Sequence, residues 1–194
     1  MKNKLLTISN SDWTKIKIKN SKFFSKAYQV RTKYEVEDIL NKIKTENSNA
    51  NHVVYAYRLL EDKKIVEYNT DAGEPAKSSG PPILKVIKGN QLIDVAIYVV
   101  RYFGGIKLGI GGLIKAYTNS AQLALKSAKI IEKINYKNIK IVTDYNDLGF
   151  ILGKIEKHKG QIKNIEYDQK ITIEFKITNQ NLKNLKKDKQ VKFD

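Results

Sequence analysis

The sequence predicts an α+β protein made of two units, residues 1–134 and 135–194. Alternating polar and apolar residues, the pattern of half-buried strands, recur along the chain, and segments with helical spacing lie between them. This pattern is interrupted between Glu132 and Lys137, where a second set of strands and helices begins. With 194 residues, of which 41% are hydrophobic, the chain can fill one large core or two small ones.

A β-hairpin is expected over Trp13–Val30, with its turn near Asn20 and Ser21. Its first strand alternates lysine with isoleucine, so one face carries lysines spaced two apart. The lysines of this hairpin that we consider are Lys15, Lys17, Lys19 and Lys22. The row is either a solvated face that discourages edge-to-edge aggregation or a platform for phosphate groups, and the sequence leaves both interpretations open.

Spacing predicts the other elements of the first unit. They are a helix over residues 34–46, strands over 52–60 and 64–68 that are joined at Glu61 and Asp62 as a second hairpin, a helix over 82–88, a strand over 93–103 and a helix over 113–131. The strand over 93–103 is almost continuously apolar, which indicates that both of its faces are buried and that it lies centrally in the sheet. Pro82 suits a first helical turn, and Gly89 with Asn90 ends that helix.

The second unit is predicted in the same way. Its elements are a strand over 138–145, a helix over 147–158, two strands within 162–177, a lysine-rich helix over 179–189 and a last strand in the VKF that follows. This β-α-β-β-α order, with the additional strand, is the split ferredoxin-like order.

The net charge of +16, from 36 basic and 20 acidic residues, favours anionic partners such as RNA or the ribosome surface. A biased genome composition is the alternative explanation, because 33 of the 36 basic residues are lysine. No apolar run is long enough to cross a bilayer and the first residues are too polar for a signal peptide, so we expect no membrane and a cytoplasmic location. The absence of cysteine and the presence of only two histidines argue against thiolate and multi-histidine metal sites, and no cofactor is expected.

One stretch, from Asp71 to Gly112, contains eight of the eleven glycines and all three prolines. Glycine is needed where the backbone takes a positive φ or where another group approaches the main chain closely. Two glycine-rich turns on either side of one strand therefore indicate a site built from backbone rather than a cleft of catalytic side chains.

The first turn contains two carboxylates, Asp71 and Glu74. They can act as an acid/base pair or hold Mg²⁺, or they can accept backbone N–H groups, and Glu74 can instead pair with Arg101. Ser78 and Ser79 precede a helix and are expected to be its N-caps. No His/Asp arrangement supports either serine as a nucleophile.

The second turn, GGIKLGIGGLIK, has neither the G-x-G-x-x-G spacing of dinucleotide sites nor the G-x-x-x-x-G-K of the P-loop. Its glycines either expose backbone N–H groups to an anion, with Lys107 and Lys115 adding charge, or let the following helix pack closely on the sheet. Arg58 and Arg101 flank this region and carry planar guanidinium groups that suit carboxylate or phosphate. His52 is expected to be structural rather than a ligand.

These considerations give two sets of candidate residues and assign no catalytic residue and no metal ligand. The ligand- or anion-binding set is Arg58, Asp71, Gly73, Glu74, Ser78, Ser79, Gly80, Arg101, Tyr102, Gly104, Gly105, Lys107, Gly109, Gly111 and Gly112. The nucleic-acid-binding set is Lys15, Lys17, Lys19, Lys22 and Lys115.

The residues of this stretch resemble those of the IMPACT/YigZ family. The two-domain layout also resembles that family, over nearly the whole chain. The resemblance rests on Asp71, Gly73, Glu74, Pro75, Gly80 and Pro82, on Arg101–Gly105, Lys107–Gly109, Gly111–Leu113 and Ala116–Tyr117, and on His52 and Ala56–Arg58. It implies a first domain similar to the fold shared by a small-subunit ribosomal protein and the GHMP kinases. It also implies a second domain similar to the ferredoxin-like last domain of elongation factor G, and work connected with translation or nucleic acid.

Two departures limit what the resemblance implies. Bacterial relatives typically read DGEPSGTAG, whereas Ala76 and Lys77 stand here in place of the Ser-Gly pair, so a role for that serine is not carried over. The eukaryotic relatives regulate an amino-acid-starvation kinase pathway through an extra domain that these 194 residues do not contain.

The leading hypothesis is a non-enzymatic, translation-associated protein that binds RNA or the ribosome and is a candidate regulator. The alternatives are a phosphate- or nucleotide-handling enzyme that uses the Asp71–Gly112 loops and a protein-interaction adaptor.

Overall fold

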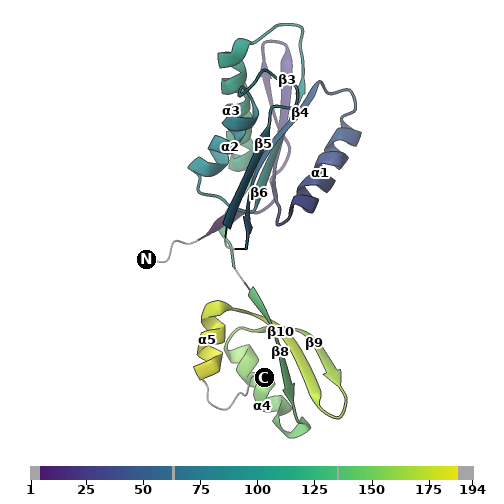
Figure 1. Ribbon diagram of the computed structural model, residues 1–194, viewed down its shortest axis with the longest axis vertical. Coiled ribbons are helices and arrows are strands. Elements are labelled where there is room, and N and C mark those ends of the chain that lie inside the picture. Colours follow the sequence, from purple (N-terminus) through teal and green to yellow (C-terminus); the bar gives the residue numbers. More distant parts are fainter. Residues whose placement is uncertain (1–4, 63, 135, 188–194) are drawn as a thin grey trace. The chain divides into compact units, whose positions relative to one another are not determined.

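The computed structural model describes residues 5–62, 64–134 and 136–187, and the chain divides into two compact units, Met1–Lys133 and Ile134–Asp194 (Figure 1). Each unit combines helices with antiparallel strands, which confirms the prediction of an α+β protein. Within the described ranges, no helix combines the length and the apolar character that crossing a bilayer requires.

The first unit is built on a five-stranded sheet with the order β2-β3-β6-β4-β5, in which every neighbouring pair is antiparallel. Its strands are β2 (Thr14–Ile18), β3 (Ser21–Gln29), β4 (His52–Glu61), β5 (Lys64–Thr70) and β6 (Val95–Tyr102). Its helices are α1 (Lys33–Glu46), α2 (Gly80–Gly89) and α3 (Gly109–Ser127). Two short strands, β1 (Leu6–Ile8) and β7 (Ile130–Glu132), pair with each other in a separate ladder. The predicted hairpins and the helix over 34–46 are confirmed.

Helices α2 and α3 cover one face of this sheet and α1 covers the other (Figure 1). The central strand β6 contributes to both cores, because Ile97 and Val99 pack towards α2 and α3 whereas Tyr98 and Val100 pack towards α1. All of β6 except Tyr102 is buried, as its continuous apolar sequence predicted. The end of β6 therefore fixes the position of the glycine-rich loop that follows it.

The helix predicted over residues 113–131 has different ends in the structure. It begins four residues earlier, at Gly109, so that three glycines of the second turn form its first turn. It ends four residues earlier, at Ser127, and Ile130–Glu132 instead pairs with Leu6–Ile8. Pairing with a distant strand, Leu6–Ile8, overrides the local helical spacing, which β-branched isoleucines support only weakly.

In the second unit the strands are β8 (Tyr136–Thr143), β9 (Gln161–Tyr167) and β10 (Ile171–Thr178), and the helices are α4 (Leu148–Lys157) and α5 (Asn179–Lys187), with a 3₁₀ turn, η1 (Tyr145–Asp147), before α4. Along the chain these elements follow the predicted β-α-β-β-α order. Within the sheet the strand order is β8-β10-β9. Alternate residues of β10 face a core that both helices complete. The last strand predicted for this unit lies outside the described residues.

Candidate functional site

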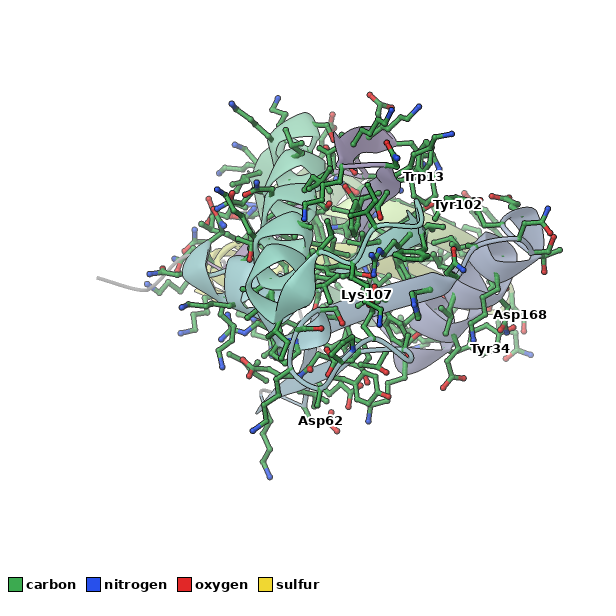
Figure 2. The ribbon with its side chains drawn as sticks, turned by 90° about the horizontal axis from the view of Figure 1, so that it is seen from above. Trp13, Tyr34, Asp62, Tyr102, Lys107 and Asp168 are labelled. Carbon is green, nitrogen blue, oxygen red and sulfur yellow. The ribbon has the colours of Figure 1, made fainter. Side chains whose placement is uncertain are left out.

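The two glycine-rich loops meet at one end of the five-stranded sheet, where they line a pocket of about 440 Å³ beside the start of α3. Five of the predicted residues line it: Gly73, Glu74, Arg101, Lys107 and Gly109. The sequence did not single out its other lining residues as ligand contacts, and these are Asn51, His52, Pro75, Phe103, Leu108, Ile110 and Leu113. In Figure 2, which views the first unit from this end, Lys107 and Tyr102 are labelled.

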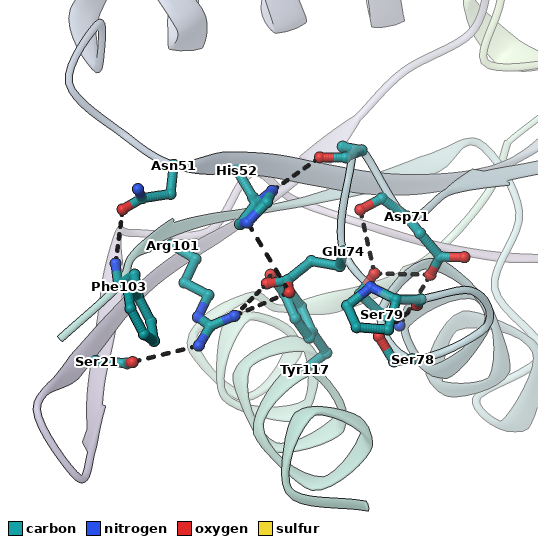
Figure 3. Close-up of polar contacts among 12 residues, drawn as sticks. Ser21, Asn51, His52, Asp71, Glu74, Ser78, Ser79, Arg101, Phe103 and Tyr117 are labelled. Carbon is teal, nitrogen blue, oxygen red and sulfur yellow. Dashed lines mark hydrogen bonds and ion pairs between the residues drawn. The ribbon is translucent and has the colours of Figure 1, made fainter. Parts of the chain in front are cut away.

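A buried ion pair, drawn in Figure 3, joins two of the residues that line this pocket, Arg101 and Glu74. Arg101 Nη1 donates to both carboxylate oxygens of Glu74, at 2.7 and 2.8 Å, and Tyr117 Oη donates to Glu74 Oε1 at 2.6 Å. The side chains of Arg101 and Glu74 are only 5% and 3% exposed. Burial, followed by the hydrogen bond to Glu74, raises the pKa of Tyr117, so its hydroxyl remains a donor. Of the roles considered for Glu74, the structure therefore shows pairing with Arg101.

The guanidinium of Arg101 is held tightly on its other sides as well. Its Cζ lies 5.3 Å from the ring centroid of Phe23 and 5.4 Å from that of Phe103, within the range of cation–π contacts. Nη2 donates a long hydrogen bond of 3.4 Å to Ser21 Oγ. Nε is buried and has no hydrogen-bond partner among the described residues, which is uncommon for a buried polar atom.

His52 links the first loop to the pocket. Its Nδ1 lies 2.9 Å from the carbonyl oxygen of Ala72. Since a carbonyl oxygen can only accept, Nδ1 carries the hydrogen. This contact agrees with the structural role expected for His52, but its Nε2 lies 3.9 Å from Glu74 Oε2, beyond hydrogen-bonding distance, and the residue lines the pocket.

Asp71 organises the first loop from its inner side (Figure 3). Its carboxylate accepts from the backbone N–H groups of Lys77, Ser79 and Gly80 and from the hydroxyl of Ser79, at 2.7 to 3.0 Å. Burial opposes ionisation of this carboxyl, but the hydrogen bonds from Ser79, Gly80 and Lys77 outweigh it and lower the pKa of Asp71. Asp71 is thus an acceptor of backbone N–H groups, which is one of the roles considered for it.

The expectation that Ser78 or Ser79 is the N-cap of α2 is confirmed by position for Ser79, but neither serine caps the helix with its side chain. Ser79 occupies the N-cap position without a capping side-chain bond, because its hydroxyl donates to Asp71. The Ser78 hydroxyl donates to the carbonyl oxygen of Pro75 at 2.6 Å. Asp71 takes over the capping role by accepting from the N–H of Gly80, nine residues further along the chain.

Neither role considered for the glycines of the second loop is shown by their surroundings, which differ from one glycine to the next. A Cβ on Gly104 would lie 2.0 Å from the carbonyl carbon of Asn20, so close packing requires glycine there. Gly105 and Gly109 have φ of 82° and 73°, which glycine adopts readily. Gly111 and Gly112 lie within the first turn of α3, whose N-terminus has no side-chain cap.

Three of the predicted residues lie elsewhere. Arg58 is at the opposite end of β4, where Nε donates to Glu67 at 3.0 Å and Nη1 to the carbonyl oxygen of Leu92 at 3.2 Å. Tyr102 points to the α1 side of the sheet, and its hydroxyl donates to Asn47 at 2.8 Å. Lys115 is exposed on α3, which covers the other side of the sheet from the hairpin lysines.

The hairpin β2–β3 carries a surface that we call the lysine–aromatic face. Its members are Trp13, Lys15, Lys17, Lys22, Phe24, Lys26 and Tyr28. Register places Lys15 opposite Phe24 and Lys17 opposite Lys22, so these side chains share one face. The Nζ of Lys15 lies 5.3 Å from the Phe24 centroid, and Lys26 contacts both Trp13 and Tyr28. Lys19 lies in the turn, and its Nζ reaches the carbonyl oxygen of Lys107 at 3.5 Å.

No three His, Asp or Glu side chains come together as a potential metal cluster in the described part of the chain. Tyr117 was not among the predicted site residues. Its position as the single aromatic residue of an alanine-rich helix could have indicated a buried hydroxyl with a specific partner. It also passed over Phe24, Lys26 and Trp13, which alternation alone would have placed beside the hairpin lysines.

Comparisons with known proteins agree with this architecture. The family model of the Impact N-terminal domain matches residues 19–125. The IMPACT family member YvyE of Bacillus subtilis is 34% identical over 168 residues, which cover 87% of this chain and 77% of that protein. YigZ of Escherichia coli, another IMPACT family member, is 28% identical over 152 residues, which cover 77% of this chain and 74% of that protein. A crystal structure of a hypothetical protein superposes with a TM-score of 0.73 at 23% identity, over 97% of this chain and 92% of that one, which shows a shared fold.

Proposed function

Because the chain belongs to the IMPACT family, we propose that it is a translation-associated protein that binds RNA or the ribosome without catalysing a reaction. Association with translation is what the family resemblance implies. A regulatory role and a cytoplasmic location are part of the same proposal. The observation that carries it is the lysine–aromatic face of the β2–β3 hairpin.

This face has the composition of a single-strand binding surface. Lysines neutralise phosphates, and aromatic rings between them offer flat surfaces on which bases of any sequence can stack. Lys15, Lys17 and Lys22 are exposed, Trp13 is 39% exposed, and Phe24 is half-buried. The overall charge of +16 adds a long-range attraction for RNA.

The pairing of Lys17 with Lys22 is a further argument. Two like charges directly opposite each other in neighbouring strands destabilise the pair. A bound phosphate between them would convert this repulsion into two favourable contacts. The solvated-face interpretation gives no reason for placing the two lysines opposite each other.

The enzymatic alternative has weaker support from the geometry. Asp71 already accepts four hydrogen bonds, and Glu74 is engaged by Arg101 and Tyr117 in a buried ion pair. Using either carboxylate to hold Mg²⁺ would break a set of contacts that organises the loop. The adaptor alternative predicts a protein partner that survives nuclease treatment.

We also propose the finer fold assignments that the resemblance implies. The first unit would be related to the ribosomal-protein and GHMP-kinase fold. The second would be a ferredoxin-like domain similar to the last domain of elongation factor G, and the order β8-α4-β9-β10-α5 with sheet order β8-β10-β9 supports it.

The test measures RNA affinity as a function of salt. A double variant, Lys15→Glu with Lys17→Glu, should weaken binding of single-stranded RNA. The slope of log K against the logarithm of the salt concentration should become about 1.4 less steep, because each lost phosphate contact accounts for about 0.7. The matched control, Lys85→Glu with Lys126→Glu, makes the same charge change at exposed positions of α2 and α3, on the other side of the sheet, and should retain most of the affinity. Equal losses in both variants would show that net charge, rather than this face, attracts RNA.

A pulldown from native lysate, with and without nuclease, separates the remaining alternatives. Loss of every partner on nuclease treatment is expected. One protein partner that persists would favour the adaptor, and no retention of RNA or ribosomes at low ionic strength would overturn the proposal.

A further inference from the structure

The pocket at the start of α3 lies on the α3 side of the sheet, whereas the lysine–aromatic face lies on the α1 side. We propose that this pocket binds a phosphate monoester, either a free nucleotide or the terminal phosphate of an RNA chain. The proposal does not depend on RNA binding by the hairpin.

The first turn of α3 supplies the donors. The opening N–H groups of a helix have no partners within the helix, and they lie at the positive end of its dipole. No side chain caps this 19-residue helix, and Gly109 and Ile110 of its first turn line the pocket. A Cβ on Gly109 or Gly111 would meet no other atom within 4 Å, so the backbone there is open to a ligand.

Arg101 is the second, independent observation. Its side chain is 5% exposed and lines the pocket, yet its Nε has no hydrogen-bond partner among the described residues. A buried donor without an acceptor costs about 1–3 kcal/mol, so such atoms are usually satisfied by a ligand or water. Because Nε itself has almost no accessible surface, an oxyanion in the pocket would supply the missing acceptor once the exposed Phe103 ring, which packs on the guanidinium, moves aside.

The local charges permit an anion to approach. Glu74 is the carboxylate that lines the pocket, but Arg101 and Tyr117 donate three hydrogen bonds to it and it is almost completely buried. The exposed Lys107 adds a positive charge at the rim, and His52 presents Nε2 to the same space. The balance of side-chain charge facing the pocket is therefore positive.

The size and the rim of the pocket point to an esterified phosphate rather than the bare ion. At about 440 Å³ the pocket falls within the range of small-molecule sites, which is far larger than one phosphate group requires. Phe103 and Ile110, which are 43% and 59% exposed, line the same space. They provide apolar surface for a sugar or base attached to the phosphate.

The decisive variant is Ile110→Glu. It places a carboxylate on an exposed position of the first turn, where acidic residues favour the helix, so the fold should be retained. The new charge competes with a phosphate for the same N–H groups and should weaken AMP binding at least about tenfold. The matched control, Ile114→Glu, introduces the same charge one turn later, at a residue that does not line this pocket.

Calorimetric titration in phosphate-free buffer at low salt would use AMP, adenosine and inorganic phosphate. Binding of AMP by the parent protein and by Ile114→Glu, much weaker binding by Ile110→Glu, and no binding of adenosine would support the proposal. Equal binding of adenosine and AMP, or an unchanged affinity in a folded Ile110→Glu variant, would overturn it.

A second arm identifies the source of the phosphate and separates this proposal from RNA binding by the hairpin. In the Lys15→Glu/Lys17→Glu background, short RNA oligonucleotides with a 5′-phosphate, a 3′-phosphate or only hydroxyl ends are compared with AMP. A preference for a phosphorylated end, or for AMP over all oligonucleotides, supports the pocket and tells which source it takes. If neither AMP nor any phosphorylated oligonucleotide binds at concentrations up to about 10 mM, the pocket proposal fails whatever the hairpin does.

Discussion

Replacing Arg101 by methionine tests its buried ion pair with Glu74. The substitution removes two of the three described hydrogen bonds to Glu74 and leaves the one from the Tyr117 hydroxyl. The side chain of Glu74 is 3% exposed, so its charge stays buried. Removing one partner of a buried pair typically costs about 3–5 kcal/mol, because the other charge stays buried without compensation. For a unit of this size, that loss corresponds to a fall in Tm of roughly 10–20 °C.

Urea unfolding followed by tryptophan fluorescence suits this test, since Trp13 is the only tryptophan and lies in the first unit. Glu74→Met and the double variant Arg101→Met/Glu74→Met complete a thermodynamic cycle. The double variant should recover most of the stability, because apolar side chains of similar volume often replace a buried pair at little cost. Coupling of at least about 2 kcal/mol is expected between contacting residues of this kind. If the double variant loses as much free energy of unfolding as the two single variants together, the argument that desolvated charge dominates this site is refuted.

Three further predictions concern the residues around that pair. Tyr117→Phe removes the 2.6 Å hydrogen bond to Glu74 and should lower the free energy of unfolding by about 1.5–3 kcal/mol in the same urea assay; no change would mean that water replaces the hydroxyl. Asp71→Asn should cost about 1–3 kcal/mol at pH 7, because the carboxylate accepts four hydrogen bonds. The folded pKa of Asp71 is lowered, so its stabilising contribution is present above the unfolded value of about 3.9 and is lost as the pH falls through the folded value. The difference between the thermal melts of the two proteins should therefore narrow as the pH falls below about 4, and a difference that does not narrow would contradict the ionic origin. Gly104→Ala should destabilise by about 3 kcal/mol or prevent folding, because its Cβ would meet the Asn20 backbone. Gly111→Ala, with open space around it, should stabilise α3 by up to about 1 kcal/mol, and a loss in both variants would show that the loop needs glycine for another reason.

Local sequence patterns predicted most elements of the fold. Alternation located the β2–β3 and β4–β5 hairpins, and the continuous apolar run located the central strand β6. These predictions succeed because the spacing of the apolar residues within a strand or helix indicates which of its faces is buried. The ends of α3 were not predictable in this way, since one end is set by a pairing between β1 and β7.

The candidate site was predictable in its location but only partly in its contacts. Glycine content indicated both loops, and Asp71 and Glu74 have roles that the sequence had placed among the alternatives. Tyr117 meets Glu74 across 43 residues, and Asp71 caps a helix that begins nine residues later. No short-range period encodes such contacts, because they depend on how separate elements pack.

The ladder between β1 and β7 brings the two ends of the first unit side by side. Leu6–Ile8 pairs with Ile130–Glu132, so the chain enters and leaves this unit at one point. A fold with adjacent ends can be inserted into a loop of another protein, or joined end to end and reopened elsewhere, without disturbing its core. The first unit can thus be exchanged or recombined as a cassette, with the crossing point in the residues that follow β7.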